Sequence, residues 1–182
     1  MDEALFAGTE AGLDAVLAAR EARVARRQDA LSRLGLPVVT VTPVMPGPVK
    51  DCLASRHLQQ AALGALADLF RERQWPANQV RAEMATTGPE ALIGVAADPF
   101  ELKRALVELE TSHPLGRLWD LDVTDPRHGD LSRRGLGLPV RRCFICDEPA
   151  HVCARSRAHP LDAVLGAIKD TLNASRPATV RA

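Results

Sequence analysis

Hydrophobic positions recur along this chain with two different periods, and the change between them predicts both helices and strands. A period near 3.6 indicates an amphipathic helix, and short β-branched runs between proline and glycine residues indicate strands. Gly35 follows the first helical pattern as a stop signal, and Asp98 precedes another as an N-cap residue. In chain order the expected elements are a helix at 12–34, a strand at 37–43, a helix at 52–74, strands at 80–86 and 91–97, a helix from Asp98 to before Pro114, strands at 115–124 and 129–132, and a helix at 161–173.

The central part of this list has the order β-α-β-β-α-β. This is the ferredoxin-like order, in which two helices cover one face of a four-stranded antiparallel sheet. The predicted fold class is therefore α+β, and the first strand is expected beside or near the strand that contains Asp120 and Asp122. We expect a single domain made of an N-terminal helical arm (1–35), the ferredoxin-like core (37–124), an Arg- and Cys-rich segment (125–160), and a C-terminal helix with its tail (161–182).

Composition and charge remove several functional classes. The chain has 23 Lys and Arg residues against 23 Asp and Glu residues, and aromatic residues make up 3% of it. A nucleic-acid-binding domain is usually basic and often stacks bases on aromatic side chains, so no nucleic-acid partner is expected. No stretch reaches the roughly 18 apolar residues of a membrane-spanning helix, and the first residues do not form a secretory signal. We therefore expect a cytoplasmic protein without a membrane partner.

Two aspartates carry the clearest chemical signal. Asp120 and Asp122 are two residues apart on a predicted strand, so both side chains project from the same face. Two carboxylates on one face repel each other unless a cation lies between them, and Mg²⁺ prefers such hard oxygen ligands together with substrate phosphates. This pattern is typical of metal-dependent phosphoryl and nucleotidyl transfer. A solvated strand edge or a helix cap is the alternative for an isolated Asp-x-Asp pair.

Basic residues follow the aspartate pair. Residues 127–157 contain seven Arg against three acidic residues, a local charge of +4 that leaves −4 for the remaining chain. Arg forks bind phosphate oxygens in pairs, so this segment suits a polyphosphate, although a basic surface paired with local acids is an equal alternative. Arg20, Arg23 and Arg26 also share one face of the first predicted helix. A solvated helix face is the simpler interpretation of those three.

Four cysteines leave a choice between reduced thiols and a metal site. Cys143, Cys146 and Cys153 have the spacing C-x₂-C-x₆-C, and a zinc site would need a fourth ligand from His151, His159 or Cys52. The second cysteine pair of an ordinary zinc ribbon is missing. Reduced, buried thiols are therefore the simpler interpretation, with structural zinc as the alternative and a redox pair as the least supported one.

Five segments are specific in combination: Pro46-Gly-Pro-Val-Lys-Asp51, Ser112-His-Pro-Leu-Gly-Arg-Leu-Trp-Asp-Leu-Asp-Val123, Leu131-Ser-Arg-Arg134, Arg141-Arg-Cys-Phe-Ile-Cys146 and Val152-Cys-Ala-Arg155. They resemble the apo-citrate lyase phosphoribosyl-dephospho-CoA transferase family, whose members are also called citrate lyase holo-(acyl carrier protein) synthases. The resemblance extends from about Arg20 to His159. The malonate decarboxylase holo-carrier-protein synthases are similar in reaction but lack this arrangement of Cys and Arg.

The resemblance implies a nucleotidyltransferase that acts on a protein. It would transfer a prosthetic group from 2′-(5″-triphosphoribosyl)-3′-dephospho-CoA to a serine of the citrate lyase acyl carrier (gamma) subunit and release diphosphate. Asp120 and Asp122 would hold Mg²⁺, and one of them could accept the serine proton. The residues expected to bind the donor are Arg117, Arg133 and Arg134, with Lys50 from a facing loop, and Arg23 and Arg26 for either the donor or an acidic carrier protein.

Two other functional classes stay open at this level. One is a non-catalytic adaptor that holds a cysteine-bound zinc and docks an acidic carrier protein through its basic face. The other is a nucleotidyltransferase with a small-molecule acceptor. Loss of diphosphate release on changing either aspartate would separate the transferases from the adaptor.

Overall fold

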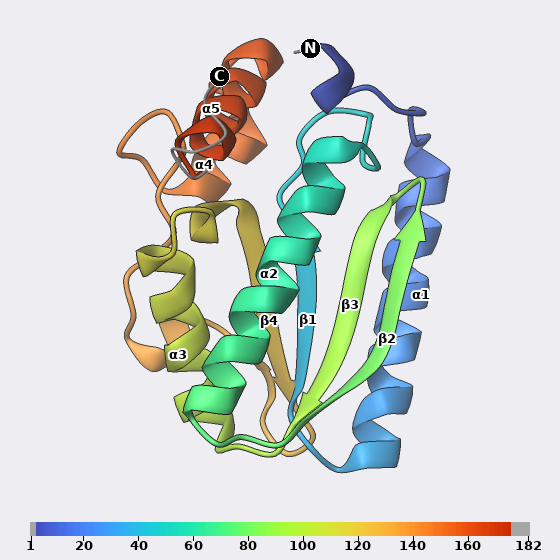
Figure 1. The fold of residues 1–182 in the computed structure, drawn as a ribbon, viewed down its shortest axis with the longest axis vertical. Coiled ribbons are helices and arrows are strands. Elements are labelled where there is room, and N and C mark those ends of the chain that lie inside the picture. The colour runs from blue at the N-terminus through green and yellow to red at the C-terminus, as the bar shows by residue number, and fades with distance from the viewer. Residues whose placement is uncertain (1–2, 176–182) are drawn as a thin grey trace.

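The computed structural model describes residues 3–175, which fold into an antiparallel sheet with helices on both faces (Figure 1). The strand order is β2-β3-β1-β4-β5, so β1 lies at the centre, directly beside β4. The predicted α+β class is confirmed. The elements are η1 (Glu3–Leu5), α1 (Leu13–Leu34), β1 (Val38–Pro43), α2 (Leu53–Glu72), β2 (Ala77–Ala85), β3 (Gly88–Val95), α3 (Pro99–Ser112), η2 (Gly116–Leu118), β4 (Trp119–Asp125), β5 (Gly129–Leu131), η3 (Arg134–Leu136), α4 (Ala150–Ser156) and α5 (Leu161–Ala174).

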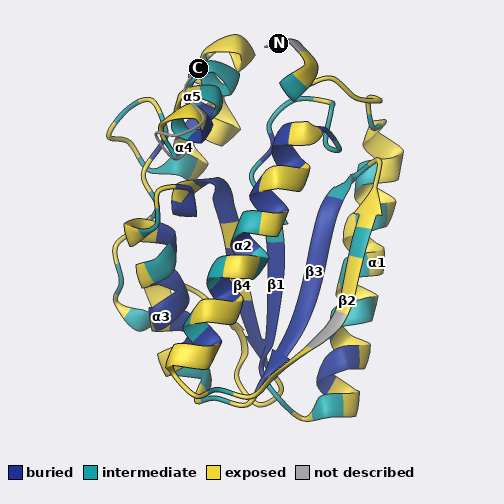
Figure 2. Cartoon of the chain, viewed as in Figure 1, coloured by how far each residue is buried: buried dark blue, intermediate teal, exposed yellow. Residues whose placement is uncertain are grey.

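One face of the sheet carries the main hydrophobic core. Figure 2 shows buried residues along β1, β3 and β4 and on the parts of α2 and α3 that face them. In β4 the side chains alternate, with Trp119, Leu121 and Val123 buried and the two residues between them exposed. This core joins the sheet to both crossover helices through Val39, Val41, Ile93, Leu121, Leu58, Leu66, Leu102 and Leu106.

The opposite face is covered by α1, but not as the apolar pattern predicts. Only the C-terminal part of α1 packs on apolar residues, where Ala30 and Leu31 meet the sheet in a second small core. Leu13, Leu17 and Val24 are exposed instead. The side that faces the sheet in the upper part of α1 is the arginine-bearing one. The interpretation of this face as solvated is therefore wrong for Arg23 and Arg26, because the buried Glu90 of β3 pairs with both, whereas Arg20 is exposed.

Several element boundaries differ from the predicted ones. The strand expected from residue 80 begins at Ala77, and the one expected from residue 115 begins at Trp119, because Gly116–Leu118 form the 3₁₀ helix η2. The β2–β3 hairpin turns at Thr86 and Thr87 rather than at 87–90, because Gly88 adopts a φ of 100° and can begin the second strand directly. The short helix α4 was not expected. Asp98 caps α3 as predicted and accepts hydrogen bonds from the N–H groups of Phe100 and Glu101. Residues 176–182 of the predicted C-terminal segment lie outside the described residues.

No helix within residues 3–175 combines the length and the apolar character needed to span a membrane. The α4 and α5 helices lie together beyond the upper end of the sheet in Figure 1, where β1 ends, β4 begins and the β2–β3 hairpin turns. Residues from distant parts of the chain are therefore brought to one end of the molecule.

Candidate functional site

The two aspartates lie on the face of β4 that is turned toward α1. Their side chains keep 53% and 60% of their surface exposed, for Asp120 and Asp122 respectively. The register between β1 and β4 places Thr42 opposite Asp120 and Thr40 opposite Asp122. The prediction that both carboxylates share one face of a strand is confirmed.

A cavity of about 350 Å³ lies beside the aspartates and is lined by charged side chains of both signs, four of them cationic. Lys103 Nζ lies 3.8 Å from Asp122 Oδ1, and Arg141 Nη1 lies 3.7 Å from Asp120 Oδ1. Both distances exceed that of a hydrogen bond. The two cations therefore offset part of the negative charge of the carboxylates without forming hydrogen bonds to their oxygen atoms. The charged residues that line this cavity are Arg27, Lys103, Glu110, Asp120, Asp122, Asp130, Arg133 and Arg141.

The proton affinity of Asp122 is altered by these surroundings. Desolvation by the cavity walls raises the pKa of Asp122, and the neighbouring charge of Asp120 raises it further. Lys103 and Arg27 act in the opposite direction without cancelling the rise. The Asp122 carboxylate is therefore held in a position where an additional cation would stabilise it.

The free edge of β4 is joined to α3 by two buried side chains. Leu121 donates its N–H to Glu110 Oε1 at 2.9 Å, and its carbonyl oxygen accepts a hydrogen bond from Lys103 Nζ at 2.8 Å. Glu110 and Lys103 thus take the place of a neighbouring strand at this point. The same Lys103 ammonium group is the one that faces Asp122.

Two arginines of the segment after β5 complete this network. Arg133 forms an ion pair with the buried Glu110, and Arg141 Nη2 lies 3.1 Å from the same carboxylate. Arg141 also donates to the carbonyl oxygen of Trp119, directly before Asp120. Because the Trp119 carbonyl oxygen and the Glu110 carboxylate both hold the Arg141 guanidinium, it is fixed beside the first aspartate rather than free to move.

A second cavity, of about 250 Å³, meets Asp120 from the other side. It is lined by Arg20 and Arg23 of α1 and by Lys50 of the loop after β1. Lys50 Nζ donates to the carbonyl oxygen of Met45 at 2.7 Å. Burial and the charge of Arg20 lower the pKa of Lys50. Asp120 therefore stands at the boundary between two cation-lined spaces.

The arginines of α1 are partly occupied by acids of the sheet. Arg23 Nε donates to Glu90 Oε2 at 2.6 Å, while Arg26 pairs with Glu90 and lies 3.1 Å from Glu83. Several buried polar atoms on this face have no hydrogen-bond partner within the described part of the chain: Nε of Arg26, Nε of Arg27 and Oγ1 of Thr40. Arg27 lines the cavity beside the aspartates, where an unpartnered donor is suited to a polar ligand.

A third cavity, of about 640 Å³, lies between the loop after β1 and the α4–α5 region. Its walls combine apolar side chains such as Phe144 and Val164 with Arg142 and Arg157. Arg141 lines this cavity as well as the one beside the aspartates. Its side chain therefore borders both spaces.

The structure does not bring all the predicted binding residues together. Arg133 lines the aspartate cavity, and Lys50 and Arg23 line the second one. Arg117 lines neither cavity and instead donates to the carbonyl oxygens of Arg142 and Cys143. Arg134 is exposed in η3, and Arg26 is held by its acidic partners.

Sequence reasoning missed three residues of this site. Arg141 was one of several arginines in a basic segment, and nothing in the sequence separates it from its exposed neighbour Arg142. Glu110 reads as an ordinary helix residue. Lys103 does leave a signal, because it falls beside Leu102 and close to Leu106 on a face that is otherwise apolar, where a cation needs a buried partner.

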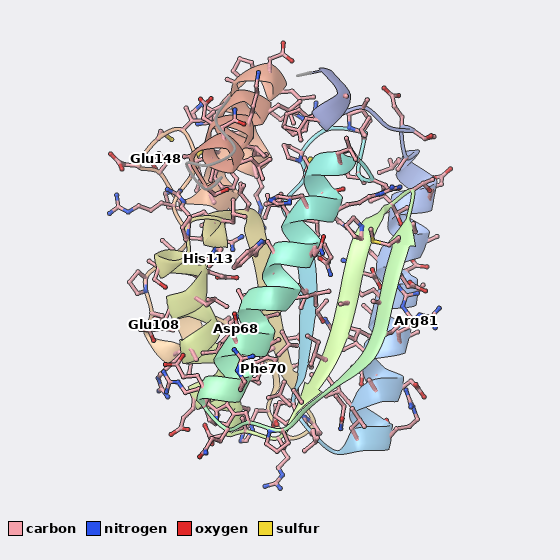
Figure 3. The ribbon with its side chains drawn as sticks, viewed as in Figure 1. Asp68, Phe70, Arg81, Glu108, His113 and Glu148 are labelled. Atoms are coloured by element: carbon pink, nitrogen blue, oxygen red, sulfur yellow. The ribbon has the colours of Figure 1, made fainter. Side chains whose placement is uncertain are left out.

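His113 ends α3 and is labelled in Figure 3, but it serves packing rather than the site. Its ring lies 4.4 Å from that of Trp119, and its Nδ1 accepts the N–H of Leu115 at 3.0 Å. Burial lowers the pKa of His113, which favours the neutral ring that this hydrogen bond requires.

The three clustered cysteines of the sequence do come together. Cys146 Sγ lies 3.5 Å from Cys153 Sγ and 3.3 Å from His159 Nε2, and Cys143 completes a group whose ligand atoms all lie within 4.8 Å of one another. All four cysteines are free thiols, and Cys52 is buried separately at the N-cap of α2.

Comparison with known proteins gives a consistent result. The family model described as apo-citrate lyase phosphoribosyl-dephospho-CoA transferase matches residues 11–175. A protein of that name from Escherichia coli O9:H4 (strain HS) is 42% identical over 158 residues, covering 87% of this chain and 86% of the relative. Another, from Escherichia coli O1:K1 / APEC, is 41% identical over the same shares of both chains.

Proposed function

Because this chain belongs to the apo-citrate lyase phosphoribosyl-dephospho-CoA transferase family, we propose that it transfers the phosphoribosyl-dephospho-CoA group to a serine of the citrate lyase acyl carrier subunit and releases diphosphate. The observation that carries the proposal is the Asp120 and Asp122 pair between two cation-lined cavities. The donor is 2′-(5″-triphosphoribosyl)-3′-dephospho-CoA. Its triphosphate needs cations on both sides of the reacting phosphorus, and this site offers them.

We propose that Asp120 and Asp122 bind Mg²⁺. Within residues 3–175 no third acidic, Cys or His residue joins them in a ligand cluster, so the pair is not a closed protein cage. Mg²⁺ suits this arrangement because it usually takes one or two carboxylates and completes its shell with water and substrate phosphates. The raised pKa of Asp122 supports the same conclusion, since a cation would relieve the repulsion from Asp120. When bound, Mg²⁺ would neutralise charge that develops on the triphosphate oxygens.

The reaction is a displacement at the α-phosphorus. The serine oxygen forms a bond to this phosphorus, the bond to the bridging oxygen breaks, and both bonding electrons leave with diphosphate. The serine proton passes to one of the two site aspartates and then to solvent. Hydrogen bonds to backbone carbonyl oxygens hold Arg141 and Lys103 beside the carboxylates, where both side chains would contact the phosphates of the donor. Arg133 lines the same cavity.

The remainder of the donor extends into the cavity of about 640 Å³. Its apolar walls suit the adenine and pantetheine portions, and Arg142 and Arg157 suit the diphosphate that links them. Arg141 lines both this cavity and the aspartate cavity, so this side chain would contact the donor where its triphosphate portion meets the remainder.

We also assign the part of the sheet formed by β1 to β4 to the ferredoxin-like arrangement. Support comes from the order β2-β3-β1-β4 and from one core that joins these strands to α2 and α3. In this assignment β5 is an added edge strand and α1 an added helix on the other face. The cytoplasmic location stays a prediction.

Substitution of each aspartate tests the role of the pair. We expect Asp120→Asn and Asp122→Asn each to abolish diphosphate release in the presence of donor, carrier and Mg²⁺, while circular dichroism shows an intact fold. Asp68→Asn is the matched control, because Asp68 is exposed on α2 and its one ion pair within residues 3–175 is with Arg71 on the same helix. Unchanged turnover in either site variant would refute the proposed role. Carrier binding without any diphosphate release from the wild-type chain would instead favour an adaptor.

A further inference from the structure

The geometry points to a structural zinc site formed by Cys143, Cys146, Cys153 and His159. It lies outside the aspartate cavity, and three of its residues, Cys143, Cys153 and His159, line the cavity of about 640 Å³. Tetrahedral zinc with Zn–S bonds of about 2.3 Å places its ligand sulfurs about 3.8 Å apart. The separations of 3.5 Å between the Cys146 and Cys153 sulfurs and 3.3 Å from Cys146 Sγ to His159 Nε2 are close to that spacing. Small side-chain shifts would complete the tetrahedron.

The local backbone brings these four residues together from three short pieces of chain. Cys143 and Cys146 lie on one turn, in which the N–H of Ile145 points to Cys143 Sγ at 3.5 Å. Cys153 is on α4, and the chain reverses at Arg157, a non-glycine residue with a φ of 50°, before it reaches His159. A left-handed conformation at such a residue persists where other interactions fix the turn, and a bound metal would supply them.

Packing alone does not explain the order of this segment. Of residues 137–160, only Phe144 packs against the main core, and its side chain is only partly buried. Val140, Ile145 and Val152 are exposed, and α4 is seven residues long. Small units without their own core are commonly held by a metal or disulfides, and all these cysteines are free. Zinc is the metal that this combination of three thiolates and one imidazole favours.

The surrounding charge also fits the metal. Three thiolates and Zn²⁺ carry a net charge of −1, which nearby cations would balance. Arg117 donates to the carbonyl oxygens of Arg142 and Cys143, so a guanidinium is fixed next to the first ligand. Because Arg141 is two residues before Cys143, the metal would hold the chain that carries this arginine against β4.

The structure also separates the ligands from residues of the same type. His151 is exposed and lies outside the cluster, and Cys52 is buried at the start of α2. These two residues provide matched controls. Cys52→Ser keeps a hydrogen-bonding group at the N-cap, and His151→Ala changes only an exposed side chain.

Metal analysis of the full-length chain, purified without chelators or metal-affinity resins, tests the proposal without donor or carrier. We expect one zinc ion per chain in the wild type, Cys52→Ser and His151→Ala proteins, and less than about a tenth of that in Cys146→Ser and His159→Ala. Cobalt in place of zinc should give the sulfur-to-cobalt charge-transfer band of thiolate ligation. Because no transfer reaction is measured, failure of this test leaves the proposed function standing, and the reverse also holds.

Measurements on the wild-type protein test the proposed zinc site even if the ligand variants fail to fold. Native mass spectrometry should show bound zinc, and a thiol-blocking reagent should release it. Three results would each overturn the proposal: a wild-type chain free of zinc after growth in zinc-supplemented medium, a mass that indicates a disulfide among these cysteines, or iron in place of zinc. Equal zinc loss in the control variants would also overturn the assignment of ligands.

Discussion

At the scale of single residues, Asp122 occupies a position where its negative charge is unfavourable. Cavity walls remove part of its solvent, Asp120 adds a second negative charge, and together they raise its pKa above the ordinary value of 3.8. A carboxyl group whose pKa is raised on folding destabilises the folded state when it ionises. Such a cost is commonly retained at sites that bind cations or substrates.

The first prediction concerns stability. In metal-free buffer near neutral pH, Asp122→Asn should raise Tm by about 2 °C, because the variant removes the unfavourable charge. The sign follows from linkage: the destabilisation is complete above the raised folded pKa and disappears below the unfolded value of 3.8. The difference in Tm between the two proteins, measured by calorimetry, should therefore narrow as the pH falls. A variant that is less stable than the wild type at neutral pH would contradict this picture.

Arg141 is defined by its geometry rather than by its charge alone. Its guanidinium reaches the Trp119 carbonyl oxygen, the Glu110 carboxylate and the vicinity of Asp120 at the same time. A lysine ammonium group is a single point charge and cannot hold three such directions. This requirement could not be predicted from the sequence, because the partners of Arg141 lie on α3 and β4, far from it along the chain.

We expect Arg141→Lys to lower kcat/KM for the donor at least about tenfold, although the charge is kept. Steady-state measurement of diphosphate release gives this ratio. Arg71→Lys is the comparison, since Arg71 is exposed on α2 and forms an ion pair with Asp68 on the same helix. Equal activity of Arg141→Lys and the wild type would show that positive charge alone suffices there.

At the scale of elements, the contact between α3 and β4 determines where the site forms. The free edge of β4 has no strand beside Leu121, and α3 satisfies that residue's backbone with Glu110 and Lys103. A buried carboxylate with cationic and N–H donors around it is stable only while all the partners remain. The helix that packs the core therefore also fixes the cations of the site.

Removing the negative charge of Glu110 should weaken the contact between α3 and β4. We expect Glu110→Gln to lower the free energy of unfolding by about 2–3 kcal/mol, because it leaves Arg133 and Arg141 without their buried counter-charge. Urea denaturation followed by circular dichroism measures the change. Glu108→Gln serves as the control on the same helix, since Glu108 is exposed (Figure 3). Similar stability of the two variants would show that the buried network contributes little.

Physical reasons also explain which features of the elements could be predicted from the sequence and which could not. The alternation around Asp120 and Asp122 identifies their shared face, because the period of a strand depends only on local geometry. The orientation of α1 could not be predicted in the same way. Its apolar and arginine faces compete for the sheet, and Glu90, a buried residue more than sixty positions away, decides the outcome.

At the scale of the whole molecule, the two faces of the sheet have different roles. One face holds the apolar core with α2 and α3, and the other leaves the aspartates open between α1, the loop after β1 and the segment after β5. The cavity of about 640 Å³ is lined by residues of α4 and α5, which lie beyond one end of the sheet in Figure 1. The sequence predicts the order of the elements that build this end, whereas the cavity between the β1 loop and α5 depends on long-range packing that no local pattern encodes.

The central claim is that this chain attaches a phosphoribosyl-dephospho-CoA group to a carrier protein through the Asp120 and Asp122 site. Intact-mass spectrometry of the citrate lyase acyl carrier subunit, incubated with the full-length chain, Mg²⁺ and the triphosphate donor, observes that product directly. We predict that the carrier gains the mass of one phosphoribosyl-dephospho-CoA group on a serine, and that Asp120→Asn protein leaves it unchanged. A carrier of unaltered mass after incubation with the wild-type chain, or one modified equally by the variant, would contradict the claim.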